Sequence, residues 1–175
     1  MSKLVVLSGV PGSGKSYFSE TIKKVKGSHV YIISSDKLRS QMLGNQQDLS
    51  KDRVMWQMFY ELPKVYSLDK EGLVLLDATH IRSNKRIEIA NNLKNYFDEI
   101  DLVLFNLDKD VIANQNIQRE YPVPSDVLSS FLESFELPKV EENELFTHIY
   151  QISSNDIAKV INELLADEDK LNLFK

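Results

Sequence analysis

The sequence predicts an α/β fold in which a doubly wound, five-stranded parallel sheet carries helices on both faces. Short and nearly continuous runs of Val, Ile and Leu recur along the chain, which is typical of strands buried on both faces. Amphipathic stretches separate these runs, and alternating strands and helices favour right-handed crossovers. The 175 residues are 42% hydrophobic and 27% charged, so a single domain spanning residues 1–175 is expected.

The five strands are expected at five apolar runs. The last of these runs alternates weakly, so it is predicted to lie at an edge of the sheet. The predicted strands are Lys3–Ser8, Val30–Ser34, Leu73–Asp77, 101–107 and 146–152.

Helices are expected between the strands. Ser83 is predicted to cap a helix whose apolar positions continue to Phe97. A helix over residues 52–68 contains Pro63, which is expected to kink or split it. The last helix is expected to begin at Ser154 or Asn155. Its apolar stripe is Ile157, Val160, Ile161, Leu164 and Leu165, whereas the acidic run Glu141, Glu142 and Glu144 is predicted to be a solvated loop.

Composition excludes several classes of function. The net charge of −5 argues against a protein that coats long nucleic acids, although a small basic pocket stays compatible with it. The absence of cysteine excludes thiolate catalysis, disulfides and cysteine-ligated zinc. The first apolar run is too short for a signal peptide, and no run could cross a membrane. A cytoplasmic protein without a membrane partner is predicted, and its oligomeric state stays open.

Residues 9–16 (GVPGSGKS) match the pattern GxxxxGK[ST] of a phosphate-binding loop, between a predicted strand and a predicted helix. Glycines let several backbone N–H groups converge on one anion. Lys15 would then reach the β- and γ-phosphates, and Ser16 would complete a magnesium shell. The alternative is a tight glycine turn. The predicted cofactors are ATP and Mg²⁺, and the predicted nucleotide contacts are Gly9, Pro11, Gly12, Ser13, Gly14, Lys15 and Ser16.

The rest of the sequence favours a kinase among the classes that use this loop. The pair Asn84-Lys85 does not continue into the NKxD pattern of guanine-specific switches. Asp77 is followed by Ala78, whereas ATP-driven motors usually carry an Asp-Glu pair at this strand end.

Polar residues follow the second strand, where ligands of a doubly wound sheet bind. A kinase acting on an alcohol needs a carboxylate to accept the hydroxyl proton, and Asp36 is the candidate. The alternative is that Asp36 caps the next helix. Arg39 lies on the same helical face and could bind an anionic group of the acceptor, or be an ordinary surface arginine.

Residues after the third strand are further candidates. Asp77, or Asp36, could hold magnesium through a water molecule, and Asp77 could instead pair with Arg39 or be a turn residue. Thr79 and Arg82 are candidate acceptor contacts. Three cations at the start of the next helix oppose its dipole, which indicates either an anionic partner or a solvated basic face. They are Arg82, Lys85 and Arg86.

Residues 109–124 are predicted to form a helical lid that stops at Pro122 and Pro124. Arg119 would close over the ATP phosphates and help to exclude water, or else be an exposed arginine before a turn. By position alone, the residues after the fifth strand could adjoin an adenine. They are Ser153, Ser154 and Asn155.

Four segments together resemble the kinase domain of phage-type polynucleotide 5′-kinases. They are GVPGSGKS, SSDKLR, LLDATH and NIQREYPVPSDVL, and the resemblance runs over about residues 4–137. It implies transfer of the ATP γ-phosphate to the 5′-hydroxyl of DNA or RNA. It also implies that Asp36 is the general base, that Arg39 contacts the acceptor 3′-phosphate, that Asp77 braces Arg39, and that Arg119 is the lid arginine.

The chain departs from that family in its lid, which offers one basic residue where the family often has two. Small kinases with a similar loop also act on nucleosides, sugars and other metabolites. The acceptor is therefore expected to be the 5′-hydroxyl end of a single-stranded nucleic acid or a small-molecule alcohol. A regulatory ATP-binding module without an acceptor is the remaining alternative.

Overall fold

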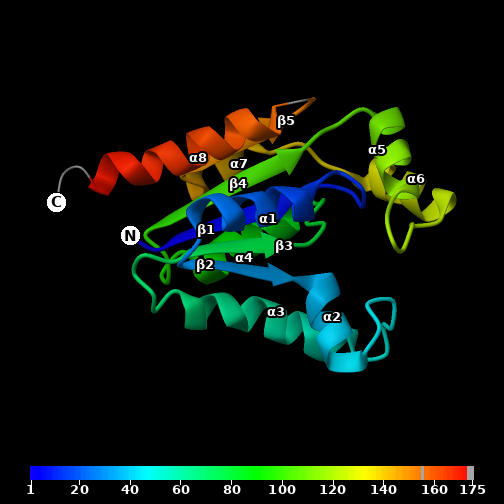
Figure 1. Cartoon of the computed structure of the whole chain (residues 1–175), viewed down its shortest axis with the longest axis horizontal. Coiled ribbons are helices and arrows are strands. Elements are labelled where there is room, and N and C mark those ends of the chain that lie inside the picture. The colour runs from blue at the N-terminus through cyan, green and yellow to red at the C-terminus, as the bar shows by residue number, and fades with distance from the viewer. Residues whose placement is uncertain (155, 173–175) are drawn as a thin grey trace.

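The computed structural model describes residues 1–154 and 156–172, and its centre is a five-stranded parallel sheet with the strand order β2-β3-β1-β4-β5 (Figure 1). The first strand is therefore central and the fifth lies at an edge, as the sequence predicts. The strands are β1 (Lys3–Ser8), β2 (Val30–Ser34), β3 (Leu73–Asp77), β4 (Glu99–Phe105) and β5 (His148–Ile152).

Three strands have the predicted bounds, and β4 and β5 differ by two residues. The position of β4 follows from its pairing with the whole of β1, which runs from Lys3 opposite Glu99 to Ser8 opposite Leu104. β5 begins at His148, opposite Asp101 in β4. Hydrogen-bond pairing thus decides the strand ends, where the apolar pattern alone is ambiguous.

Helices cover both faces of the sheet, which confirms the doubly wound prediction. One core contains Phe18 of α1 and Val160 of α8, and the core of the other face contains Phe59 of α3 and Ile89 of α4. The helices are α1 (Lys15–Lys26), α2 (Ser35–Leu43), α3 (Asp52–Tyr66), α4 (Ser83–Leu93), α5 (Lys109–Ile117), α6 (Ser125–Ser134), α7 (Val140–Leu145) and α8 (Ile157–Asn172).

Several predictions about the helices are wrong in detail. Ser83 is the first residue of α4 rather than its cap, because its hydroxyl donates to a buried carboxylate of Glu142. α4 ends at Leu93, so Phe97 packs on the core from the following turn. Pro63 lies inside α3 without splitting it.

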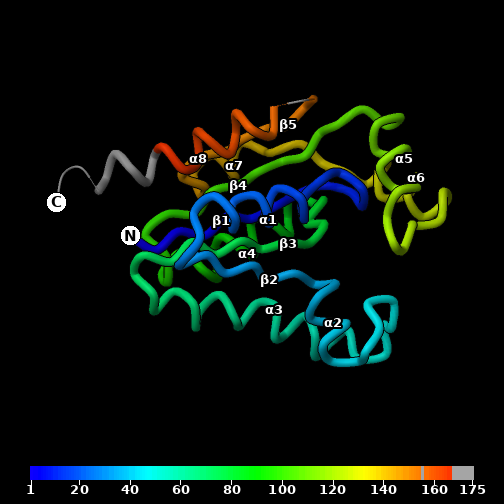
Figure 2. Tube along the Cα trace, in the orientation of Figure 1, coloured from blue at the N-terminus to red at the C-terminus, as the bar shows by residue number. Residues whose placement is uncertain are grey.

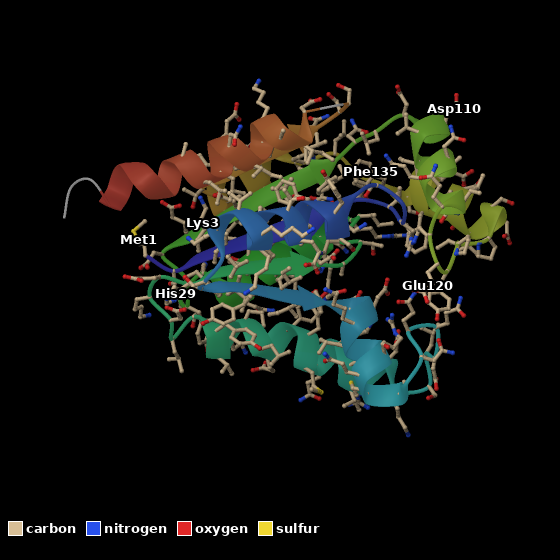
Figure 3. The ribbon with its side chains drawn as sticks, in the orientation of Figure 1. Met1, Lys3, His29, Asp110, Glu120 and Phe135 are labelled. Atoms are coloured by element: carbon tan, nitrogen blue, oxygen red, sulfur yellow. The ribbon has the colours of Figure 1, made fainter. Side chains whose placement is uncertain are left out.

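The carboxyl ends of the strands, α2, α5 and α6 gather at one end of the molecule (Figure 2). Lys3 and His29 lie at the opposite end (Figure 3). Parallel strands bring their carboxyl ends together at one edge, so the residues that follow β1, β2 and β3 become neighbours. Among the described residues, no helix is both long and apolar enough to cross a membrane.

Candidate active site

The phosphate loop, residues 9–16, leads from the central strand β1 into α1. Gly12 and Gly14 have φ of +80° and +98°, a left-handed conformation that favours glycine. Gly9 has a different reason to be glycine, because a Cβ there would lie 2.6 Å from Ser13 Oγ and 2.9 Å from Phe105 Cβ. The expectation that Gly9 serves backbone conformation is therefore corrected to a requirement for space.

Lys15 spans this loop from its α1 end. Its Nζ donates at 2.9 Å to the carbonyl oxygens of Gly9 and Val10, and it lies 3.4 Å from Ser13 Oγ. Burial lowers the pKa of Lys15 to about 8, while the charge of Asp77 opposes that shift. A buried ammonium held by loop carbonyls is suited to meet a phosphate oxygen at the same place.

Ser16 and Asp77 bring a hydroxyl and a carboxylate together beneath the loop. Ser16 Oγ donates at 2.8 Å to Oδ2 of Asp77, which is 6% exposed. Burial raises the pKa of Asp77, although the charge of Lys15 and the bond from Ser16 act against the rise. Hydroxyl and carboxylate oxygens are ligands that Mg²⁺ prefers, so this pair fits a magnesium ion beside the phosphates.

Asp36 stands in the first turn of α2. The cap of this helix is Ser34, whose Oγ accepts the N–H of Lys37, so the alternative that Asp36 is the cap is wrong. Asp36 Oδ1 lies 3.2 Å from Nη1 of Arg39, and its Oδ2 lies 3.7 Å from Nη2 of Arg119. One arginine of the same helix and one from the turn after α5 therefore flank this carboxylate.

Arg39 is held against α3. Its Nε donates at 2.8 Å to Oδ1 of Asp52, the first residue of α3, and its Nη1 lies 3.4 Å from the carbonyl oxygen of Gln46. The prediction that Asp77 braces Arg39 is wrong, because Asp77 bonds to Ser16 and Asp52 takes the bracing position. Asp52 was missed because helix packing, not sequence spacing, brings it to Arg39.

The predicted lid, residues 109–124, comprises α5 and the connection 118–124, and α6 follows it. α5 ends at Ile117, so Arg119 lies in the turn beyond the helix rather than within a helix stopped by proline. A small apolar core joins the lid to the phosphate loop through Val10, Ile112 and Leu128. The lid is therefore packed against the loop, and Arg119 reaches toward Asp36 of α2. Glu120, the next residue, lies at the end of the molecule that carries α2, α5 and α6 (Figure 3).

The charged side chains of the phosphate loop, the strand ends and the lid interact electrostatically with one another. The charges of Asp77, Arg119 and Asp36 all act on the pKa of Lys15. Asp36 and Lys15 likewise both act on Asp77. β3 lies between β1 and β2 in the sheet, yet the phosphate loop after β1 and Asp36 after β2 act on the same charged groups at the carboxyl edge.

A family model described as an AAA domain matches residues 4–138, most of the chain. The chain belongs to this AAA-domain family. L-seryl-tRNA(Sec) kinase of Methanococcus maripaludis is 24% identical in an alignment 196 residues long. The alignment covers 96% of this chain and 70% of that protein.

Solved structures of other proteins share the fold of this AAA domain. A gluconokinase from Sinorhizobium meliloti 1021 superposes with a TM-score of 0.63 at 22% identity, over 98% of this chain and 95% of that one. A fungal RNA kinase gives a TM-score of 0.70 at 15% identity, over 97% of this chain and 44% of that one. These two likenesses are evidence of a common architecture.

The structure also places three further candidates, and the acceptor contacts of Thr79 and Arg82 stay predictions. Arg86 is fully buried and pairs with Glu142 of α7 at 2.6 Å, so neither a basic face nor a solvated acidic loop describes this pair. Arg82 is exposed at the start of α4. Thr79 contributes its carbonyl oxygen, which accepts the N–H of Gly9 at 2.8 Å.

The segment after β5 forms a polar turn. The hydroxyls of Ser153 and Ser154 lie 3.2 and 2.7 Å from the carboxylate of Asp156, and Asn155 lies outside the described residues. These bonds explain the local turn without reference to a base. An adenine contact at Ser153 and Ser154 stays a prediction.

Proposed function

We propose that this AAA-domain chain is a kinase that transfers the γ-phosphate of ATP to the 5′-hydroxyl of a polynucleotide. The observation that carries this proposal is the position of Asp36, between Arg39 and Arg119 and within electrostatic reach of Lys15. Phosphoryl transfer to an alcohol that carries a nearby anion requires three groups. These are a base, a cation that binds the anion, and a lid cation.

The donor side consists of the phosphate loop. Backbone N–H groups and Lys15 would bind the β- and γ-phosphates of ATP. Ser16 and Asp77, whose oxygens are 2.8 Å apart, would hold the magnesium ion. When bound, that ion would neutralise charge on the β- and γ-phosphate oxygens.

The acceptor side begins at Asp36. Its carboxylate would accept the hydroxyl proton while the acceptor oxygen forms a bond to the γ-phosphorus and the bond from that phosphorus to the bridging oxygen breaks. ADP leaves with the electron pair of the broken bond. Arg119 would stabilise charge on the transferred group and keep water away from it.

The short distance between Asp36, the proposed base, and Arg39 suggests which chemical groups the acceptor carries. A hydroxyl on Asp36 and an anion on Arg39 would lie close together, since Oδ1 and Nη1 are 3.2 Å apart. The 5′-hydroxyl and 3′-phosphate of one nucleotide share a sugar and meet this requirement. The words tRNA and RNA in the names of two relatives support a nucleic-acid acceptor.

A small hydroxy acid is the second candidate acceptor. Its carboxylate would suit Arg39 equally well, and the net charge of −5 favours a small acceptor over a long polyanion. The gluconokinase that shares the fold is consistent with such an acceptor.

The test supplies ATP labelled in the γ-phosphate with single-stranded oligonucleotides that differ only in a 5′-hydroxyl or 5′-phosphate. A panel of sugars and hydroxy acids, and a reaction without acceptor, run in parallel. The proposal expects label only on the 5′-hydroxyl oligonucleotides. Label on a small acid would establish the second candidate, and slow hydrolysis unaffected by any acceptor would establish a regulatory module.

A further inference from the structure

Asn116 carries a buried side-chain amide near the end of α5, just before the connection 118–124 of the lid. Its side chain is within the last turn of the helix, and the residue is 5% exposed. Its Nδ2 donates at 2.8 Å to the carbonyl oxygen of Val123, and its Oδ1 accepts the N–H of Val123 at 3.0 Å. Both polar ends of one side chain are therefore used on the backbone of a single residue.

These two bonds close the segment 117–122 into a loop, and Arg119 lies within it. The N–H of Arg119 donates at 3.2 Å to the carbonyl oxygen of Asn116, so the backbone of the same residue also fixes the start of the turn. From this loop the guanidinium of Arg119 reaches to 3.7 Å from Asp36.

Asn116 also adjoins the phosphate loop. A Cβ added to Gly12 would lie 3.2 Å from the backbone N of Asn116 and 3.3 Å from its Cα. The lid helix thus approaches the phosphate loop closely at the residue that ties the lid loop. One residue therefore meets the phosphate loop with its backbone and ties the loop that carries the lid arginine with its side chain.

We propose that Asn116 is a positioning residue that holds Arg119 at a set place over the phosphate loop. This inference rests on the proposed function, in which Arg119 serves the transferred phosphate. Asn116 itself bonds to Val123 and does not reach the reacting atoms. It acts by reducing the number of conformations that the loop 117–122 can adopt.

The amide is the chemical group that this position requires. Aspartate would keep the acceptor oxygen but would bring a second acceptor to the carbonyl of Val123, where Nδ2 now donates. Alanine would leave both backbone groups of Val123 without their partners. The matched control is Asn114, which has the same side chain on the same helix and is exposed.

The test compares Asn116→Ala and Asn116→Asp with Asn114→Ala and Asn114→Asp. Hydrogen exchange of the protein without nucleotide comes first, because it requires no activity. Loss of the bond to the Val123 N–H should speed exchange at that amide by about tenfold in the Asn116 variants. The Asn114 variants should match the wild type, and unchanged exchange in both Asn116 variants would overturn the inference.

A double-mutant cycle with Arg119→Ala then tests the link to function. Asn116→Ala should lower kcat by about 10²-fold, similar to Arg119→Ala, and the double variant should fall no lower than Arg119→Ala alone. Additive losses would overturn the positioning role. Should the wild type transfer no phosphate, the proposed function fails, and the same cycle measured on ATP affinity decides the role of Asn116.

Discussion

At the scale of single residues, the site is organised around Asp36. The carboxylate is half-exposed, yet Arg39 and Arg119 reach it from two different elements. In the proposed reaction Arg39 would have two roles, because it lies beside the proposed base Asp36 and would also bind the acceptor anion.

We expect Asp36→Asn to lower phosphoryl transfer by about 10²- to 10⁴-fold, the range attributed to general-base catalysis. ATP affinity should change little, because the phosphate loop is intact. Initial rates with labelled ATP and nucleotide titrations measure the two quantities. Asp126→Asn, at an exposed carboxylate of α6, is the control. A near-normal transfer rate in Asp36→Asn would remove Asp36 as the base.

Asp52 should affect acceptor binding through Arg39. Replacing it by asparagine weakens a 2.8 Å charge-assisted bond to Arg39 Nε, so we expect the acceptor KM to rise about tenfold with a smaller change in kcat. Asp52→Glu should restore part of the affinity. Equal KM values for the wild type and Asp52→Asn would show that Arg39 needs no brace.

Lys15 should make ATP binding depend on pH. Burial lowers its pKa to about 8, and phosphate binding favours the protonated form. ATP affinity should therefore be constant below that pKa and fall as pH rises, by up to about tenfold per unit. Calorimetric titration between pH 7 and 9.5 measures this. A flat affinity over that range would contradict the assignment.

At the scale of elements, a buried ion pair joins α4 to α7. Arg86 and Glu142 are fully buried, and Arg86 Nη2 also donates at 3.0 Å to the carbonyl oxygen of Glu136. Burial alone would raise the pKa of Glu142, but the hydrogen bonds from Arg86 and Ser83 outweigh it and hold the pKa below its usual value. This pair anchors the chain after the lid to the sheet.

Breaking the pair should destabilise the protein strongly. Arg86→Met leaves the Glu142 carboxylate buried without its partner, at an expected cost of about 3–5 kcal/mol in the free energy of unfolding. The double variant Arg86→Met, Glu142→Leu should recover part of that loss, because no isolated charge remains. Urea unfolding measures both, and Lys85→Met, at a partly exposed cation of the same helix, serves as the control. Equal stability of Arg86→Met and the wild type would be inconsistent with this role.

At this scale the sequence predicts features that depend on residues close together in the chain, and it misses contacts between residues far apart in the chain. β1, β2 and β3 were predicted with their observed bounds because each is a compact apolar run between polar residues. The position of Asp36 at the edge of the sheet from which the phosphate loop leaves β1 also followed, because parallel strands end at one edge. The Arg86–Glu142 pair joins residues 56 positions apart, and no local pattern indicates such a contact.

At the scale of the whole molecule, His80 couples folding to pH. It follows β3 with a left-handed φ of +39°, and its Nδ1 lies 2.9 Å from the carbonyl oxygen of Leu7 in the central strand. Its ring lies 5.7 Å from that of Phe59 in α3. Burial lowers its pKa to about 4, so the folded protein keeps the imidazole neutral where the unfolded chain would bind a proton.

Stability should therefore fall as the solution is acidified through this range. The contribution of neutral His80 is complete above the unfolded pKa of about 6.5 and is lost progressively toward pH 4, by about 3 kcal/mol in total. His80→Asn, which tolerates a left-handed backbone, should flatten this dependence. Urea unfolding at pH 7, 5.5 and 4.5 measures the slope. An unchanged slope in the variant would show that other groups cause it.

The strand order has a consequence for biosynthesis. The loop that would hold nucleotide leaves β1, whose two neighbours, β3 and β4, end at residues 77 and 105. During translation the phosphate loop is therefore synthesised before both strands that pair with β1. The loop should reach its final conformation only after residue 105 has left the ribosome. Binding of nucleotide to nascent chains of increasing length would consequently show the length at which β3, β1 and β4 have paired.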